Sequence, residues 1–145
     1  ATAFGHRTVL LPLFPWWDLS LLRLSWGLLN DPLTAVMLLV VLSISLLVHL
    51  YSAGYMAGDP HRPRFFAYLS LFTFFMLVLV VAPNLPQLFV GWEGVGVCSY
   101  LLISFWFTRR QAAKSALKAM VVNRAGDLGL IAAMALLYRE LGTLD

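Results

Sequence analysis

Charged side chains are scarce in this sequence. Only 12% of its 145 residues are Asp, Glu, Lys or Arg, while 61% are hydrophobic, and the mean hydropathy is +0.83. A soluble domain carries about 25% charged residues, so this composition excludes a soluble globular protein and indicates an integral membrane protein. The net charge of +3 comes largely from Arg and Lys in short loops. We find no basic stripe with interleaved aromatic residues, and we therefore expect no nucleic-acid partner.

Cysteine is almost absent as well. The single residue, Cys98, excludes an internal disulfide and a cysteine-rich metal site. The sequence also lacks a dinucleotide fingerprint, a phosphate-binding loop, a metal-ligand cluster and a nucleophile triad. We therefore expect that this chain binds no metal and no cofactor and makes no covalent bonds itself.

Long apolar runs are what the sequence does contain. Four of them reach the length that spans a bilayer, and they are joined by segments rich in glycine, proline and charge. The sequence predicts an all-α membrane fold with about four transmembrane helices, at residues 33–51, 65–82, 88–107 and 116–138.

Helix starts are marked at two places. Asp31 followed by Pro32 is typical of an N-cap and a first helical position. Thr108 followed three residues later by Gln111 fits a capping box, which predicts that a helix begins there and continues into the fourth span.

The N-terminal segment differs from the rest of the chain. Pro12 and Pro15 interrupt it, and its tryptophans suit the membrane–water interface. We predict that residues 1–32 form an irregular interfacial segment, partly extended over residues 21–29, and that residues 33–145 form a four-helix membrane piece.

The loops indicate sidedness. The loops at 52–64 and 108–115 fall on one side and carry Arg62, Arg64, Arg109, Arg110 and Lys114, whereas the loop at 83–87 carries no charge. The positive-inside rule places the basic side in the cytoplasm or the mitochondrial matrix. Arg109 and Arg110 are predicted to contact lipid headgroups.

Glu93 is the carboxylate of greatest interest, because it lies inside an otherwise apolar or small-residue span. A charge at the centre of a membrane helix costs roughly 2.5–3.5 kcal/mol on insertion scales, so it requires a function or a partner. A carboxyl that faces a movable cation can change protonation state and relay protons. The alternative is a static ion pair that holds two helices together. The glycines around Glu93 make its helix thin, which lets neighbouring helices approach.

The next span carries further charges. Arg124 and Asp127 are three residues apart and can pair on one helix face, either as a neutralised pair or as part of a relay. Lys118 faces another neighbour and is either a boundary lysine or the partner of a carboxylate. His49, near the end of the first span, is either a satisfied interfacial residue or a relay member.

The motif string resembles a known family. The chain contains DPLTAVMLLVV and VHLYSAGYM, then RFFAYLSLFTFFMLVLV, then NLPQLFVGWEGVGVCSYLLISFW, then ALKAMVVNRAGDLG. In this order and spacing, they resemble the antiporter-like subunit 5 of NADH–ubiquinone oxidoreductase (respiratory complex I) over roughly residues 26–137. Subunits of multi-subunit sodium/proton antiporters are similar to much of the same string.

The resemblance implies roles for particular residues. Glu93 matches the family's carboxylate, whose partner is an intramembrane lysine on a later helix that this chain lacks. Arg124 and Asp127 match the NR-GD pair of the next helix. The candidate proton-path residues are therefore Glu93, Lys118, Arg124, Asp127 and His49.

The resemblance also implies partners and a location. Flavin, iron–sulfur clusters and ubiquinone are expected in partner subunits, and the other membrane-arm subunits and the bilayer, including anionic lipids, are expected to surround this chain. The family subunit has many more helices, so we expect this chain to be one piece of a split subunit that separate polypeptides complete within a larger antiporter-like bundle. The implied location is the mitochondrial inner membrane, with a bacterial plasma membrane as the alternative. Two other functions stay open: a piece of a cation/proton antiporter, and a structural assembly fragment with static charges.

Overall fold

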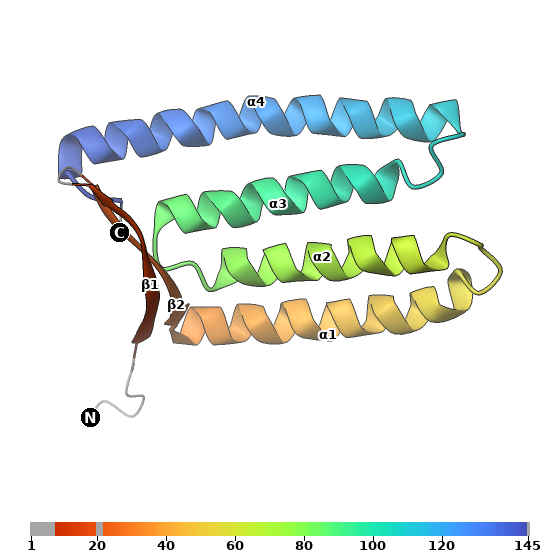
Figure 1. Cartoon of the computed structure of the whole chain (residues 1–145), viewed down its shortest axis with the longest axis horizontal. Coiled ribbons are helices and arrows are strands. Elements are labelled where there is room, and N and C mark those ends of the chain that lie inside the picture. The colour runs from red at the N-terminus through yellow and green to blue at the C-terminus, as the bar shows by residue number, and fades with distance from the viewer. Residues whose placement is uncertain (1–7, 20–21, 145) are drawn as a thin grey trace.

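The computed structural model describes the backbone of residues 8–19 and 22–144. Side chains are described for the same residues except residues 16–24. Four helices follow one another in a row, in sequence order (Figure 1), after two strands that precede them. The elements are β1 (Val9–Leu19), β2 (Leu22–Asn30), α1 (Pro32–Tyr55), α2 (Arg62–Val80), α3 (Leu85–Ile103) and α4 (Arg110–Leu141). The prediction of four helices is confirmed, and α1 and α4 are longer than the spans predicted for them.

Three of the described helices, α1, α2 and α4, are long and apolar enough to cross a membrane. Helix α3 is not among them, since Gln87, Glu93 and its glycines lower its hydropathy. It nevertheless lies between α2 and α4 in the row and contacts both (Figure 1). The polar content of α3 therefore lies where neighbouring helices can cover it.

One predicted helix start is confirmed and the other is wrong. Asp31 is the N-cap of α1, its Oδ1 accepting a hydrogen bond from the backbone N–H of Thr34 at 2.6 Å. Helix α4, in contrast, has Arg109 as its N-cap, with no side-chain capping bond, so the capping box at Thr108 does not form. Residues 104–109 instead make a turn in which the Arg109 N–H donates to the carbonyl of Trp106 at 2.9 Å.

Two glycines of α3 allow α2 and α3 to pack closely. A Cβ on Gly91 would lie 2.7 Å from the backbone of Leu79, and a Cβ on Gly94 would overlap the ring of Phe75. Only a residue without a side chain fits at either position. The predicted thinness of this helix is thus confirmed, and its effect is specific to the α2 side.

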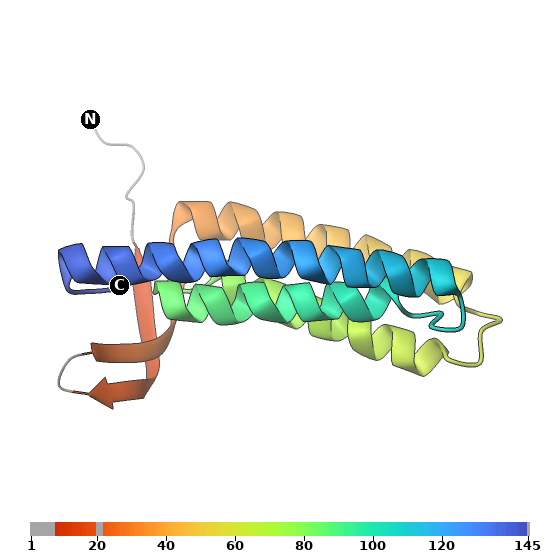
Figure 2. The ribbon, with the colours of Figure 1, turned by 90° about the horizontal axis from the view of Figure 1, so that it is seen from above.

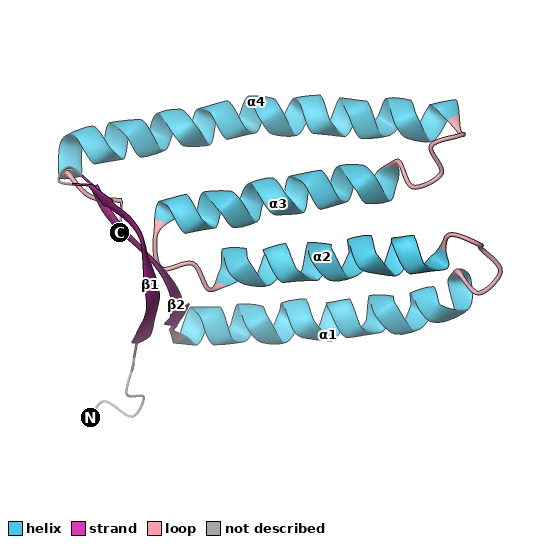
Figure 3. Cartoon of the chain, in the orientation of Figure 1, coloured by secondary structure: helices cyan, strands magenta, loops and turns pink. Residues whose placement is uncertain are grey.

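The predicted irregular segment is instead a β-hairpin over residues 9–19 and 22–30, and it precedes the helical membrane fold that was predicted. Strands β1 and β2 form an antiparallel hairpin, drawn in magenta in Figure 3, with register from Val9–Asn30 to Leu19–Leu22. The extended backbone predicted over residues 21–29 is confirmed as β2. Pro12 and Pro15, which interrupt this segment, each directly precede a register shift of β1. A strand tolerates proline at such irregularities.

The outer edge of β2 is satisfied by the turn between α2 and α3. The carbonyl of Ser25 accepts from Asn84 Nδ2 at 2.7 Å, and the N–H of Leu29 donates to the carbonyl of Val81 at 2.9 Å. Between them, Gly27 donates to Gln87 Oε1 at 3.1 Å and accepts from Gln87 Nε2 at 2.9 Å. Residues 25, 27 and 29 alternate along the strand, so this turn takes the place of a third strand.

The connections between successive helices alternate between the two ends of the helical bundle. The α1–α2 and α3–α4 connections lie at one end, and the α2–α3 turn lies at the other end with the hairpin (Figure 1). Figure 2, seen from above, shows the hairpin projecting to one side of the helices at that end. The predicted grouping of the basic loops on one side is therefore confirmed, while the identity of that compartment stays a prediction.

Candidate functional site

Charged side chains meet between α3 and α4, at about the middle of both helices. Trp92 and Glu93 belong to α3, where Glu93 is the ninth of 19 residues. Arg124 and Asp127 are the fifteenth and eighteenth of the 32 residues of α4. We call these four residues the α3–α4 charge cluster.

Arg124 joins the two carboxylates of the cluster. Its Nη1 donates to Glu93 Oε2 across the helix interface, and it lies 3.4 Å from Asp127 Oδ2 on its own helix. Trp92 Nε1 donates to the other oxygen of Asp127 at 2.9 Å. Both oxygens of Asp127 therefore have a partner, one from each helix.

The two carboxylates differ in exposure. Asp127 is buried, at 5% exposed, whereas the side chain of Glu93 retains 24% of its surface and that of Arg124 47%. A buried carboxylate with one oxygen on a guanidinium and the other on an indole N–H is well satisfied. Glu93 is the member of the pair that remains accessible.

The structure brings together three of the five predicted site residues. Glu93, Arg124 and Asp127 form one cluster, and the predicted pairing of Arg124 with Asp127 is confirmed. The expected partner of Glu93 was a lysine on a later helix outside this chain; among the described residues, Glu93 pairs with Arg124. Lys118 is exposed, lies about two turns nearer the basic loops, and takes no part in these bonds.

His49 lies at a different interface, between α1 and α2. Its Nδ1 is 2.8 Å from the carbonyl of Ser45, and its Nε2 is 3.4 Å from Ser70 Oγ. Ser45 Oγ is in turn 2.8 Å from Thr73 Oγ1. His49 thus belongs to a polar line along α1 and α2 and is not joined to the charge cluster. The proton-path roles of all five residues stay predictions.

Sequence reasoning did not assign a role to Trp92. The available signal was chemical: an indole N–H within a membrane helix requires an acceptor, because no water is present to accept its hydrogen bond. Gly96 and Val97 line the same small gap as the cluster, with Met120 and Asn123 opposite them. Gly96 and Val97 therefore lie beside Glu93 on the face of α3 that meets α4.

Asp59 is a carboxyl outside the membrane-spanning segments that contacts both loops on the basic side. The pKa of Asp59, in the α1–α2 loop, is lowered because its carboxylate accepts hydrogen bonds from the His61 N–H at 2.8 Å and from Trp106 Nε1 at 3.0 Å. These bonds tie the two loops on the basic side to each other.

Comparison with known proteins finds two matching family models. Residues 16–66 match the model described as NADH-Ubiquinone oxidoreductase (complex I), chain 5 N-terminus. Residues 82–145 match the model described as NADH:quinone oxidoreductase/Mrp antiporter, TM. Together the two matches include strand β2, helices α1, α3 and α4, the first turn of α2 and the whole charge cluster.

Individual relatives agree with these matches. NADH-ubiquinone oxidoreductase chain 5 of Metridium senile is 57% identical over 144 residues, covering 99% of this chain and 24% of the relative. The chain 5 of Arabidopsis thaliana is 61% identical over 128 residues, covering 88% of this chain and 19% of the relative. A chain of the Mrp complex from Dietzia sp. DQ12-45-1b superposes with a TM-score of 0.80 at 30% identity, covering 99% of this chain and 15% of that chain.

The row of helices with a charge cluster at mid-height, together with these matches, defines an antiporter-like membrane subunit. Within that class the chain belongs to the family of NADH-ubiquinone oxidoreductase chain 5. It spans about a quarter of the length of the Metridium relative and less of the others named here. The resemblance seen in the motif string is therefore confirmed.

Proposed function

We propose that this chain is part of a proton-translocating membrane-arm subunit of NADH:ubiquinone oxidoreductase, and that the α3–α4 charge cluster carries the proton. The observation that supports the proposal is the sharing of one guanidinium by two carboxylates in the middle of the helices. With both carboxylates ionised the cluster carries a formal charge of −1, and one added proton makes it neutral. The two states therefore differ by one exchangeable proton and by the net charge held at this depth, where net charge is costly.

In this proposal the two carboxylates have different tasks, which their different contacts support. Asp127 is held at both oxygens, by Arg124 and by Trp92, and serves as the fixed anion that keeps Arg124 in place. Glu93 is more exposed and makes its bond to Arg124 across the helix interface. Protonation of Glu93 weakens that bond and frees the guanidinium to move toward Asp127. Proton occupancy at Glu93 is thereby coupled to the position of a cation, which is what a relay requires.

The redox chemistry belongs to other chains in this proposal. This chain binds neither NADH nor quinone, and flavin, iron–sulfur clusters and ubiquinone are carried by partner subunits. Its partners are the remaining parts of the same subunit, the other membrane-arm subunits and the lipid bilayer. The location proposed is the mitochondrial inner membrane, which the eukaryotic sources of the relatives support.

A second candidate function is that of a piece of a cation/proton antiporter without a redox partner. The superposition on a chain of the Mrp complex supports it, as does the family model that includes Mrp antiporters. Gentle solubilisation of the native membrane, followed by mass spectrometry of the particle that holds this chain, separates the two. Recovery of flavin and iron–sulfur subunits favours the redox-linked function. Recovery of cation-transport subunits alone favours the antiporter.

The relay itself is tested by Glu93→Gln in the assembled parent complex. We expect assembly and NADH oxidation to persist while the number of protons moved per NADH falls. Glu140→Gln is a matched control, because Glu140 is 71% exposed at the end of α4 and its ion pair is with the adjacent Arg139, at 3.8 Å. If Glu93→Gln pumps as well as Glu140→Gln does, the charges are static and the chain is a structural fragment.

A further inference from the structure

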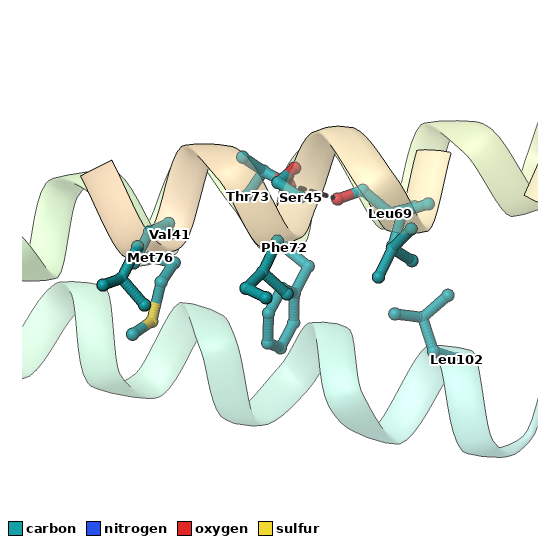
Figure 4. A pocket seen from close by; sticks show the side chains of 10 residues that line it. Val41, Ser45, Leu69, Phe72, Thr73, Met76 and Leu102 are labelled. Atoms are coloured by element: carbon teal, nitrogen blue, oxygen red, sulfur yellow. Dashed lines mark hydrogen bonds between the residues drawn. The ribbon is translucent and has the colours of Figure 1, made fainter. Parts of the chain in front are cut away.

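A groove lies on one face of α1 and α2, with Leu102 of α3 also in its lining, outside the charge cluster. It has a volume of about 330 Å³ and is lined almost entirely by aliphatic and aromatic side chains (Figure 4). Its two hydroxyl groups, on Ser45 and Thr73, are hydrogen-bonded to each other at 2.8 Å. No polar atom of the lining therefore requires a partner from an occupant, which favours a purely apolar occupant.

Arg62 lies on the face of α2 that contributes to the groove, nearer the basic loops. Leu69, Thr73 and Met76 follow Arg62 at 7, 11 and 14 residues, so helix periodicity places them on the face of Arg62. The guanidinium of Arg62 lies 5.6 Å from the ring centre of Phe66, and that ring is 6.1 Å from the ring of His49 on α1. Arg62 is thus the cation at the head of the groove.

Arg64 does not share this position. Its guanidinium donates to the carbonyl of Phe105 at 3.1 Å and lies 5.0 Å from the ring centre of that residue, on the α3 side of α2. Arg64 is therefore bonded within the protein, whereas Arg62 remains exposed at the membrane surface. An exposed guanidinium above an apolar groove is complementary to a phosphate that carries an alkyl tail.

The dimensions agree with one leaflet of a bilayer. At 1.5 Å per residue, the groove from Leu69 to Met76 lies roughly 10 to 21 Å below Arg62. The hydrocarbon core is about 30 Å thick, so the tails of one leaflet extend about 15 Å from the interface. A headgroup at Arg62 therefore places its acyl chain in the groove.

We infer that the α1–α2 groove binds one acyl chain of an anionic phospholipid, whose phosphate is held by Arg62. Apolar contacts alone do not select among lipids, because the surrounding bilayer offers the same contacts. Selectivity thus depends on the headgroup charge at Arg62. A helix of 10–12 Å diameter is too wide to enter a groove of this volume and would cover it instead.

The test uses the native complex and a phosphatidylglycerol probe with a diazirine midway along one acyl chain. After photolysis, peptide mapping is expected to find label on residues 40–48 of α1 and 69–76 of α2, and several-fold less with the matched phosphatidylcholine probe. Arg62→Gln is expected to lower the labelling by phosphatidylglycerol to the level of phosphatidylcholine. Arg110→Gln, which alters an exposed arginine on the same side of the membrane, leaves it unchanged.

Filling the groove provides an independent variant. Val41→Phe is expected to reduce the label several-fold, while Leu47→Phe, on the same helix but outside the lining, does not. Equal labelling by both probes that is insensitive to Arg62→Gln means contact with bulk lipid only and overturns the inference. Absence of label in the groove, with label on other lipid-facing peptides, means that protein covers it and also overturns the inference.

Discussion

A single buried amide makes two of the four hydrogen bonds described above between β2 and the helical part of the chain. Gln87 is 1% exposed, and its side chain makes both of its bonds to one residue, accepting from the N–H of Gly27 and donating to the carbonyl of Gly27. Gln87→Leu keeps a similar volume and removes both bonds. The variant therefore leaves one donor and one acceptor of β2 buried without a partner.

The size of the effect follows from those two groups. Each unsatisfied buried polar group costs about 1–3 kcal/mol, and the added apolar contact of leucine offsets part of the sum. We expect the docking of the hairpin to weaken by about 2–4 kcal/mol. Since 1.4 kcal/mol is a factor of ten, local opening becomes at least about 30-fold more frequent.

Hydrogen exchange of the β2 amides in the purified complex measures that opening. Amides of residues 22–30 are expected to exchange at least about 30-fold faster in Gln87→Leu, while Gln111→Leu, at an exposed position on α4, changes nothing. Gln87→Glu adds a second check: its carboxylate cannot donate to the Gly27 carbonyl, but its protonated form can, so protection is expected to return as the pH falls. Unchanged exchange in Gln87→Leu would refute the assignment of hairpin docking to this amide.

Two further predictions concern packing and the loops. Gly91→Ala places a Cβ 2.7 Å from the Leu79 backbone, so the free energy of unfolding should fall by about 1–3 kcal/mol, measured as a lower melting temperature of the complex. Gly54→Ala, with nothing within 4 Å of the added Cβ, should be neutral or slightly stabilising. For Asp59, whose pKa is lowered, the stabilisation is present above pH 3.8 and lost as the pH falls through the lower, folded value. A fluorescence titration of Trp106 should show a transition below pH 3.8 that Asp59→Asn abolishes; a midpoint at or above 3.8 would contradict the contact.

The sequence predicted the helical part of the fold because membrane helices are specified locally. Runs of apolar residues must satisfy their backbone within themselves in lipid, so their length and order can be read without knowledge of any partner. The Asp31 cap is local for the same reason, since donor and acceptor are three residues apart. Glu93, Arg124 and Asp127 were identifiable because a charge in an apolar run is costly wherever its partner lies.

Tertiary structure decided the partners of those groups. Arg124 meets Glu93 across 31 residues of chain, and Gln87 meets Gly27 across 60, and neither spacing follows from helix periodicity. The pairing of the hairpin was not predicted, because Pro12 and Pro15 interrupt the segment and the register shifts that accommodate them are visible only in the structure. Lys118 was predicted to face another neighbour, and the structure leaves it exposed, whereas the interface that His49 occupies, between α1 and α2, was visible only in the structure. Residue chemistry by itself therefore determined which groups needed partners in the membrane, and the packing of α3 between α2 and α4 determined which partners they found.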